Sequence, residues 1–297
     1  MRVFVTGATG LIGGTVALRL IQAGHTVTGL VRDPAKARPL ADLGVHPVSG
    51  TLDDTDLLTD QATRADAVVN AADSDHRGAV ETLIAALAGT GKALIHTSGT
   101  GIVATGTTGE RSEDVFTEDV LDSGWTPDHP IRQARVAIDR LVLSARDVRS
   151  VVLCNSLVYG RGHALARDSV LIAALVRQAR SGGARHVGPG TNLWSNVHAD
   201  DLADLYLLAL EQAPPGTFAF AEAGEESFGA MAGAIARALG LPAPRPWDPD
   251  APDNVWDPQF ARHALGSNSR VSGTRARDLL GWRPRHHSIT GWLATAF

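Results

Sequence analysis

Short runs of aliphatic and β-branched residues alternate with longer segments of helical periodicity through the first half of the chain. Such runs are typical of strands that are buried on both faces of a parallel sheet, and the longer segments are typical of the helices that connect them. Six strands are expected, at residues 3–6, 26–31, 45–48, 67–70, 93–97 and 151–154. The pattern therefore predicts an α/β fold that is built on a doubly wound parallel sheet.

The pattern changes after about residue 160. A glycine-rich stretch at 181–190 and a proline-rich stretch at 242–258 show no strand periodicity, while residues 196–213 include one more helix. Stretches rich in glycine and proline are typical of connecting segments. We therefore expect residues 1–160 and the return helix at 196–213 to form the core, and residues 161–297 to form a smaller substrate-binding lobe that is interleaved with it.

The composition limits the classes of function. Of the 297 residues, 44% are hydrophobic and 20% charged, as in ordinary globular proteins, and the net charge of -5 disfavours a nucleic-acid partner. The one cysteine, Cys154, excludes an intrachain disulfide and a cysteine-rich metal site. No apolar run suits a membrane span or a secretory signal, and two lysines against 25 arginines favour a bacterial source. We expect a cytoplasmic protein with a small-molecule substrate, no membrane partner and no metal.

A glycine-rich turn links the first predicted strand to the first predicted helix. Its glycines Gly7, Gly10 and Gly13 are spaced three apart. This spacing lets backbone N–H groups approach a pyrophosphate at the positive end of the helix. The spacing alone is weak evidence, but its place between strand and helix is typical of a Rossmann fold that binds a dinucleotide. The residues expected to contact the pyrophosphate are Gly7, Thr9, Gly10, Leu11, Ile12 and Gly13.

The end of the second predicted strand bears on which dinucleotide is bound. NAD-binding folds hold the ribose 2′-hydroxyl with an acidic residue near this position. Here Arg32 comes first, and Asp33 is followed by Pro34, a pair that is typical of the start of a helix. Arg32, with Lys36 nearby, offers positive charge to the 2′-phosphate of NADP. We therefore predict that NADP(H) is bound, with Arg32 and Lys36 as contacts.

Five further segments occur in the order found in one known superfamily. They are Val69-Asn70-Ala71-Ala72, His96-Thr97-Ser98-Gly99, Leu157-Val158-Tyr159-Gly160, Val197-His198-Ala199-Asp200-Asp201-Leu202-Ala203 and Leu280-Gly281-Trp282-Arg283-Pro284. With the glycine turn, they make the chain similar to the extended and atypical short-chain dehydrogenase/reductases, including the NAD-dependent epimerase/dehydratases. The resemblance implies that Ser98 is the active-site serine. It also implies cofactor contacts at Asn70, Ala71 and Ala72 on the adenine side, and at Asn155 and Leu157 beside the nicotinamide.

The catalytic pair of that superfamily is missing. Its reductases use a tyrosine as proton donor and a lysine four residues later, and the matching positions here hold Ile131 and Arg135. Neither tyrosine of the chain is followed by a lysine at this spacing. Arg135 can hold the nicotinamide ribose, but its guanidinium does not give up a proton. The candidates for acid–base chemistry are Ser98, Tyr159 and His129, a loop imidazole just before the helix.

Three classes of function remain open. The first is an NADP(H)-dependent reductase of a small, moderately hydrophobic carbonyl, imine or activated alkene, because the cofactor carries the hydride chemistry. The second is a sugar-nucleotide epimerase or dehydratase, whose chemistry normally uses as its base the tyrosine that is missing here. The third is a non-catalytic NADP-binding regulator or a redox-neutral isomerase. The alanine-rich helices at 77–88 and 131–145 would allow a homodimer, and a monomer is also open.

Overall fold

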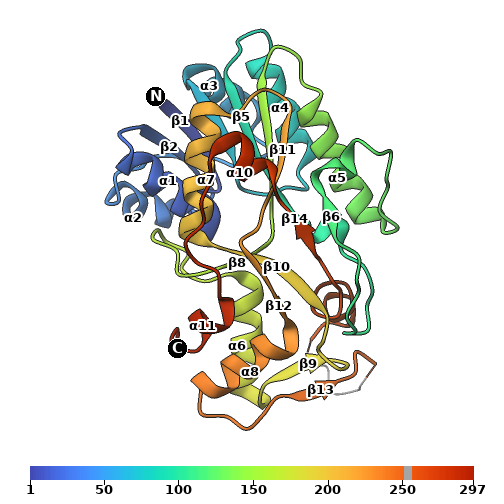
Figure 1. Cartoon of the computed structure of the whole chain (residues 1–297). Coiled ribbons are helices and arrows are strands. Elements are labelled where there is room, and N and C mark those ends of the chain that lie inside the picture. Colours follow the sequence, from blue (N-terminus) through green and yellow to red (C-terminus); the bar gives the residue numbers. More distant parts are fainter. Residues whose placement is uncertain (251–255) are drawn as a thin grey trace.

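The central element of the computed structural model, which describes residues 1–250 and 256–297, is a parallel sheet of seven strands (Figure 1). Its strand order is β11-β7-β5-β4-β1-β2-β3. The strands are β1 (Arg2–Thr6), β2 (Thr26–Val31), β3 (His46–Ser49), β4 (Ala67–Asn70), β5 (Ala93–Gly99), β7 (Arg149–Asn155) and β11 (Thr217–Ala221). The six expected strands are confirmed, and β11 is an addition that pairs with the edge of β7, Thr217 opposite Val151.

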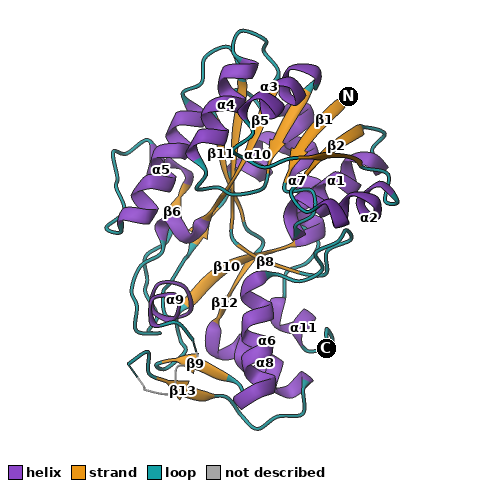
Figure 2. Ribbon diagram, turned by 180° about the vertical axis from the view of Figure 1, so that it is seen from behind, coloured by secondary structure: helices purple, strands orange, loops and turns teal. Residues whose placement is uncertain are grey.

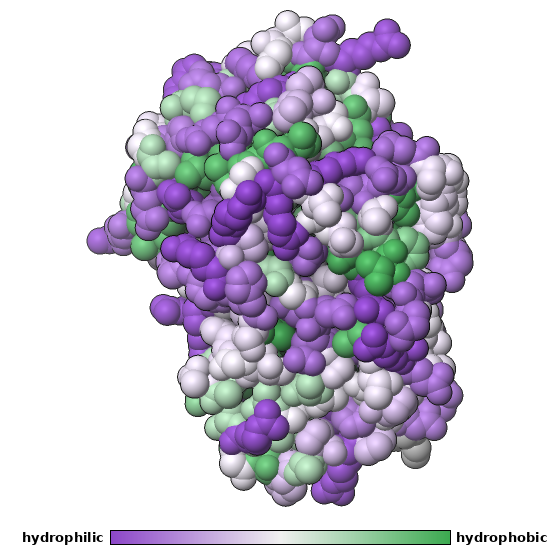
Figure 3. Space-filling model, viewed as in Figure 1, coloured by the Kyte–Doolittle hydropathy of each residue, from purple (hydrophilic) through white to green (hydrophobic). Residues whose placement is uncertain are grey.

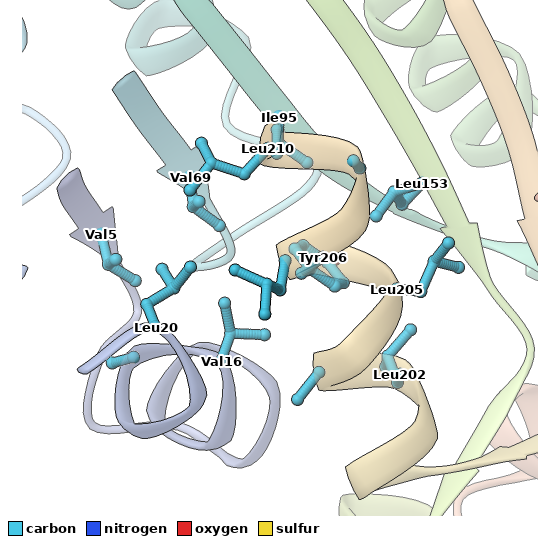
Figure 4. Packing of buried hydrophobic residues seen from close by; sticks show 14 of the residues in the cluster. Val5, Val16, Leu20, Val69, Ile95, Leu153, Leu202, Leu205, Tyr206 and Leu210 are labelled. Carbon is cyan, nitrogen blue, oxygen red and sulfur yellow. The ribbon is translucent and has the colours of Figure 1, made fainter. Parts of the chain in front are cut away.

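Helices cover both faces of this sheet, because consecutive residues of a strand point to opposite sides. Val3 and Val5 of β1 pack in one apolar cluster and Phe4 packs in another. One face is covered by α1 (Leu11–Gln22), α7 (Ala199–Gln212) and α10 (Arg275–Leu280), and the other by α3 (Thr55–Arg64), α4 (Arg77–Leu87) and α5 (Pro130–Leu143). Figure 4 shows α7 beside α1 and the sheet, with Tyr206 on the side of Val16 and Leu210 close to Val69 and Ile95.

A smaller group of elements forms a lobe below the sheet in Figures 1 and 2. Its own sheet has the order β12-β10-β8, in which β10 (Leu193–His198) is parallel to β8 (Leu157–Tyr159) and antiparallel to β12 (Gly224–Ser227). The lobe also contains α6 (Val170–Gly182), β9 (Arg185–Val187), α8 (Phe228–Ala238), β13 (Arg245–Trp247), α9 (Pro258–Phe260), η4 (Ala261–Leu265) and α11 (Ile289–Leu293). Phe228, Met231 and Trp247 belong to its separate apolar cluster.

The chain passes between core and lobe more often than the sequence pattern indicates. After β10 it returns to the core as α7 and β11, goes back to the lobe as β12 and α8, and later reaches the core again as α10. The strand β11 and the helices α7 and α10 of the core therefore come from residues 161–297. The minor elements are η1 (Pro34–Lys36), α2 (Ala37–Ala41), η2 (Thr100–Val103), η3 (Glu118–Leu121) and the strand pair β6 (Phe116–Thr117) with β14 (Val271–Ser272).

The face of the molecule in Figure 3 is mostly hydrophilic, and its hydrophobic residues gather in small separate patches. Isolated patches of this kind are ordinary on globular proteins. Within residues 1–250 and 256–297, no helix combines the length and the apolar character that crossing a bilayer requires.

Candidate functional site

A cavity of about 430 Å³ opens at the carboxyl ends of β1, β2, β3 and β4. Its lining is Gly7, Thr9, Gly10, Leu30, Arg32, Gly50, Thr51, Leu52, Asp53, Ala71, Ala72, Asp73 and His76. In open parallel sheets, ligands bind outside the carboxyl ends of the strands. The glycine turn therefore faces a space that extends along the sheet as far as Arg32.

A second cavity, of about 450 Å³, adjoins the first, since Gly10, Ala71 and Ala72 line both. The rest of its lining is Leu11, Ile12, Leu157, Val158, Ser169, Val170, Leu171 and Trp194, from the core and from the lobe. Within the described part of the chain, no charged side chain lines this second cavity. The two adjoining cavities are together named the long cleft here, with Arg32 in the lining of the first cavity and Trp194 in the lining of the second.

The glycine turn allows very close approach of backbone segments. Gly7 has a φ of +72°, and a Cβ there would lie 2.4 Å from the carbonyl oxygen of Ala71. A Cβ on Gly13 would lie 2.4 Å from the carbonyl oxygen of Gly7. Gly10, the N-cap of α1, offers no side chain to the first N–H groups of the helix. Those N–H groups and the helix dipole therefore remain available to an anion such as a pyrophosphate.

Arg32 is the one arginine or lysine that lines the long cleft within residues 1–250 and 256–297. The next residue, Asp33, is engaged elsewhere, because its Oδ1 accepts a hydrogen bond of 3.0 Å from the N–H of Ala35 and caps η1. The prediction that Asp33 starts a helix is confirmed. Lys36, at the end of η1, is exposed and lies outside the lining. The end of β2 therefore presents a cation, and not a carboxylate, to the cleft.

Sequence reasoning missed part of the lining. Residues 50–53 follow β3. His76 caps α4 through Nδ1, which accepts a hydrogen bond from the N–H of Ala79, and its Nε2 lies 3.1 Å from Oδ1 of Asp53. Both groups follow strands, β3 and β4, whose carboxyl ends lie at the same edge of the sheet. The strand order β4-β1-β2-β3 would have pointed to them, whereas the glycine spacing concerns the end of β1 alone.

Three predicted cofactor contacts, Asn70, Asn155 and Gly13, are buried outside the lining of the long cleft. Nδ2 of Asn70 lies 3.1 Å from Nδ1 of His96, and Nδ2 of Asn155 donates to the hydroxyl of Tyr206 at 3.1 Å. Both asparagines are buried, and Gly13 is buried within α1. None of the three lines the cleft, and their predicted contacts with the cofactor stay predictions. By contrast, Gly7, Thr9, Gly10, Leu11, Ile12, Arg32, Ala71, Ala72 and Leu157 all line it.

Ser98 does not face the long cleft. It is 3% exposed, and its Oγ donates a hydrogen bond of 2.7 Å to Oδ2 of Asp139 beneath α5. The next residue, Gly99, is partly exposed, and a Cβ there would lie 3.9 Å from Nη1 of Arg135. The end of β5 nearest to Arg135 therefore carries no hydroxyl. This position gives no support to the predicted catalytic role of Ser98.

Tyr159 is buried in the core of the lobe. Its ring lies 5.1 Å from that of His198 and 5.9 Å from that of Trp292, and its hydroxyl has no hydrogen-bond partner among the described residues. Burial raises the pKa of Tyr159 to about 12. Because it lines neither cavity, Tyr159 is not placed to protonate a ligand of the long cleft. The other tyrosine, Tyr206, is also buried and pairs with the hydroxyl of Thr97 at 2.7 Å.

Arg135 lies on the second turn of α5 and reaches toward the carboxyl end of the sheet. Its Nε donates a hydrogen bond of 2.7 Å to Oδ1 of Asp75, in the segment that follows β4. Asp73, two residues earlier, lines the long cleft. One turn before Arg135, Ile131 is 63% exposed. Arg135 thus lies beside the segment after β4 but lines neither cavity, and its predicted contact with the nicotinamide ribose stays a prediction.

Asp139 and His96 form a buried pair below the cleft. Oδ1 of Asp139 lies 3.7 Å from Nε2 of His96, and neither atom has a hydrogen-bond partner among the described residues. Burial raises the pKa of Asp139 to about 7 and lowers the pKa of His96 to about 4. Both side chains are therefore largely uncharged between these two pKa values.

Asp139→Asn is expected to change how stability depends on pH. The pKa of Asp139 is raised in the folded state, so its contribution is present at low pH and is lost as pH rises toward 7. The pKa of His96 is lowered, so its contribution is lost as pH falls from 6.5 toward 4. In the wild type, the free energy of unfolding changes with pH in opposite directions through Asp139 and through His96, so the two changes offset each other. The variant keeps only the change that comes from His96. Its free energy of unfolding should therefore rise as pH increases from about 4 to 6.5.

Urea unfolding at a series of pH values between these limits measures this effect. Asp42→Asn, which changes an exposed aspartate, serves as the matched control. If the free energy of unfolding of Asp139→Asn depended on pH as that of the wild type does, Asp139 would be ionised across this whole pH range.

One set of potential metal ligands occurs within the described residues. Ligand atoms of His198, Asp200 and His286 lie within 4.8 Å of one another. The two imidazole rings are stacked, with centroids 3.9 Å apart and planes at 20°. Since nitrogen lone pairs lie in the ring plane, near-parallel rings do not direct them at one ion. The set gives no reason to revise the prediction that no metal is needed.

Comparison of the sequence and the fold with known proteins identifies the family to which this chain belongs. The model of the NAD dependent epimerase/dehydratase family matches residues 3–220. The oxidase ucsJ of Acremonium sp is 34% identical over 95% of this chain and 92% of its own length, and the 3-diazoavenalumate denitrifying reductase of Streptomyces sp is 28% identical over 97% of each chain. The dTDP-glucose 4,6-dehydratase of Bacillus anthracis, solved with NAD, has a similar fold, with a TM-score of 0.77, 17% identity and coverage of 99% of this chain and 95% of that one. The resemblance inferred from the motifs is confirmed: the chain belongs to the NAD-dependent epimerase/dehydratase family.

Proposed function

We propose that the protein is an NADP(H)-dependent reductase of a small, moderately hydrophobic carbonyl, imine or activated alkene. The observation that carries the proposal is the long cleft, which runs from Arg32 across the glycine turn to an uncharged, largely apolar pocket. The family is described as NAD dependent, and two relatives are named as an oxidase and a reductase. These names support an oxidoreductase.

The residues along the cleft fit a dinucleotide that carries a 2′-phosphate. The glycine turn leaves the space and the N–H groups that a pyrophosphate needs, and Arg32 lies beyond it at the end of β2. A guanidinium keeps its charge and can bind phosphate with two hydrogen bonds. Arg135, which pairs with Asp75 in the segment after β4, would hold the nicotinamide ribose. When bound, the reduced nicotinamide would supply a hydride to the substrate.

The second cavity favours an uncharged and partly apolar substrate. Leu157, Val158 and Leu171 present aliphatic surface, Trp194 presents an indole ring, and Ser169 is the one hydroxyl-bearing side chain in the lining. Apolar contact of this kind contributes about 25 cal/mol for each Å² removed from water. A sugar nucleotide carries a diphosphate that needs cationic partners, and the lining described offers none. Epimerase or dehydratase chemistry also lacks the tyrosine base, so this class of function ranks second.

Substrate-dependent oxidation of NADPH, followed by its near-ultraviolet absorbance, tests the proposal. A panel of apolar and aromatic ketones, imines and conjugated enones forms one arm, and UDP- and dTDP-sugars form the other. Turnover is expected in the first arm only. Calorimetric binding of NADP⁺ without turnover of any compound would favour a regulator, and turnover of a sugar nucleotide would overturn the substrate class.

Two further predictions accompany the proposed function. We place the protein in the cytoplasm, and we expect a monomer or a homodimer. The helices α4 and α5, which cover the same face of the sheet, are the surfaces through which two subunits would pair. Size-exclusion chromatography with light scattering distinguishes the two oligomeric states.

A further inference from the structure

The lining of the second cavity contains two side chains with a polar atom, Ser169 and Trp194. Nε1 of Trp194 is engaged, because it donates a hydrogen bond of 2.8 Å to the carbonyl oxygen of Ser267. The hydroxyl of Ser169 makes no hydrogen bond within residues 1–250 and 256–297. Among the described residues, Ser169 is therefore the one side chain that can donate a hydrogen bond to a molecule in this cavity.

Ser169 lies where a serine hydroxyl normally binds its own helix. It is the N-cap of α6, with φ of -63° and ψ of 135°, and an N-cap serine usually accepts a hydrogen bond from the first turn. Two other serines do so: Oγ of Ser227 accepts from the N–H of Ala230 at 3.2 Å, and Oγ of Ser288 accepts from that of Gly291 at 3.0 Å. Of the serine N-caps in the described part of the chain, the one in the cavity is thus the one whose hydroxyl stays available.

The second cavity has a core side and a lobe side. The start of α1, with Gly10, forms part of the core side, and Ser169 and Trp194 lie on the lobe side (Figure 1). Gly10 and Ala71 also line the first cavity, so a dinucleotide bound there would extend to the core side of the second. A substrate in the remaining space would then contact the lobe side, where the free hydroxyl lies.

Trp194 gives the lobe side a fixed aromatic surface. Its N–H binds Ser267, and its ring centroid lies 6.0 Å from that of Phe228, with the planes at 83°. Because the N–H is engaged, the indole presents apolar ring surface to the cavity. Aromatic rings gain contact energy beyond the area that they bury when they meet another ring in a stacked or edge-on arrangement. The lobe side therefore combines a surface for an aromatic ring with a donor for one oxygen.

The other candidates for acid–base chemistry lie outside the cavity. Ser98 and Tyr159 are buried and line neither cavity. His129 caps α5, its ring centroid lies 4.9 Å from that of His263, and it is likewise absent from both linings. None of the three is placed to contact an oxygen of a substrate in the second cavity.

We propose that the hydroxyl of Ser169 donates a hydrogen bond to the carbonyl oxygen of the substrate, an uncharged aromatic ketone whose ring packs on Trp194. The inference rests on the proposed reductase function. As the carbonyl carbon gains a C–H bond from the hydride, the π pair of the C=O bond moves to oxygen. The O–H donor and the positive end of the α6 dipole stabilise the charge that develops there. The resulting alkoxide takes a proton from water and leaves hydroxide in solution. The ketone becomes a secondary alcohol, NADPH is oxidised to NADP⁺, and Ser169 keeps its own proton.

Two substitutions at Ser169 test the hydrogen bond. Ser169→Ala removes the donor but no helix cap, because the hydroxyl does not bind α6. Its melting temperature and its Kd for NADPH should equal those of the wild type. Its kcat for an aryl ketone, followed by the absorbance of NADPH, should fall by roughly 10²–10³-fold, as when one oxyanion donor is removed. Ser169→Thr keeps a hydroxyl at this position and should retain most of the activity.

Trp194→Leu tests the aromatic substrate class. The ratio of kcat/KM for an aryl ketone to that for an aliphatic ketone of similar size should fall by about 2–10-fold, because only the aryl ketone loses a ring contact. Comparing two substrates on one variant cancels any general loss of active protein. An unchanged ratio would overturn the aromatic substrate class.

Ser227→Ala is the matched control for Ser169→Ala. Ser227 is also a partly exposed N-cap serine of a lobe helix, but its hydroxyl does cap that helix, and it lines neither cavity. Its melting temperature should fall and its kcat should be that of the wild type. An active wild type with an equally active Ser169→Ala variant would overturn the inference alone, and so would equal falls in melting temperature in Ser169→Ala and Ser227→Ala. A wild type without turnover on any compound would overturn the proposed function together with it.

Discussion

Gly13→Ala is expected to abolish the binding of NADP(H) and to destabilise the fold. The added Cβ would lie 2.4 Å from the carbonyl oxygen of Gly7, so backbone must move. Gly7 cannot move away easily, because its φ is +72° and the space beyond it is filled by the carbonyl oxygen of Ala71. Overpacking of this kind costs about 1–3 kcal/mol. Displacing the turn from α1 also misaligns the N–H groups that would hold the pyrophosphate, so affinity should fall by more than about 100-fold.

Isothermal calorimetry with NADP⁺ and thermal unfolding measure the two effects. Gly233→Ala is the matched control, because Gly233 also lies within a helix and its added Cβ would meet only the end of the Arg237 side chain, at 3.5 Å. The control should bind NADP⁺ like the wild type and gain up to about 1 kcal/mol in stability. Unchanged NADP⁺ affinity in Gly13→Ala would show that the turn does not hold the cofactor.

Arg32→Gln is expected to weaken NADPH binding by about 10–100-fold and to leave NADH binding nearly unchanged. Charge-assisted hydrogen bonds are worth about 1.5–3 kcal/mol, and NADH has no phosphate to lose them. Arg32 lines the cavity beside the glycine turn, whereas the carboxylate of Asp33 is engaged in the cap of η1. The preference for NADPH over NADH should therefore depend on the guanidinium of Arg32.

The ratio of kcat/KM for NADPH to that for NADH checks this prediction. Lys36→Gln is the control, since Lys36 was predicted to share the phosphate but lies outside the lining. Its effect should be small. Equal losses for both cofactors in Arg32→Gln would mean that Arg32 contacts a part that they share. A larger loss in Lys36→Gln would place the 2′-phosphate farther along η1.

Local patterns in the sequence were enough to predict much of the core. Five of the six strands from β1 to β7, excluding the two-residue β6, are largely apolar and buried, as both faces of a covered parallel sheet demand. The exception is β3, which lies at the edge of the sheet and is largely exposed. The glycine turn was recognisable because φ of Gly7 and the contact of Gly13 forbid a side chain. Asp33 before Pro34 predicted a helix start for a similar reason, since capping depends on adjacent residues.

The direction of individual side chains at the ends of the strands was decided by the tertiary structure. Asn70, Ser98 and Tyr159 lie in segments that the resemblance identified, yet each points into the interior, toward His96, Asp139 and the ring of His198. Those partners are 26, 41 and 39 residues away along the chain. Moving by one residue along a strand moves from one face of the sheet to the other. The local sequence does not show which residues of the fold will pack against each face.

The sequence by itself thus determined six strands of the main sheet, the glycine turn and the family, because each depends on residues that are neighbours in the chain. The tertiary structure decided the addition of β11 to the sheet, the lining of the long cleft and the meeting of His129 with His263. These features depend on contacts between residues far apart in sequence, and such contacts exist only once the core and the lobe have packed together.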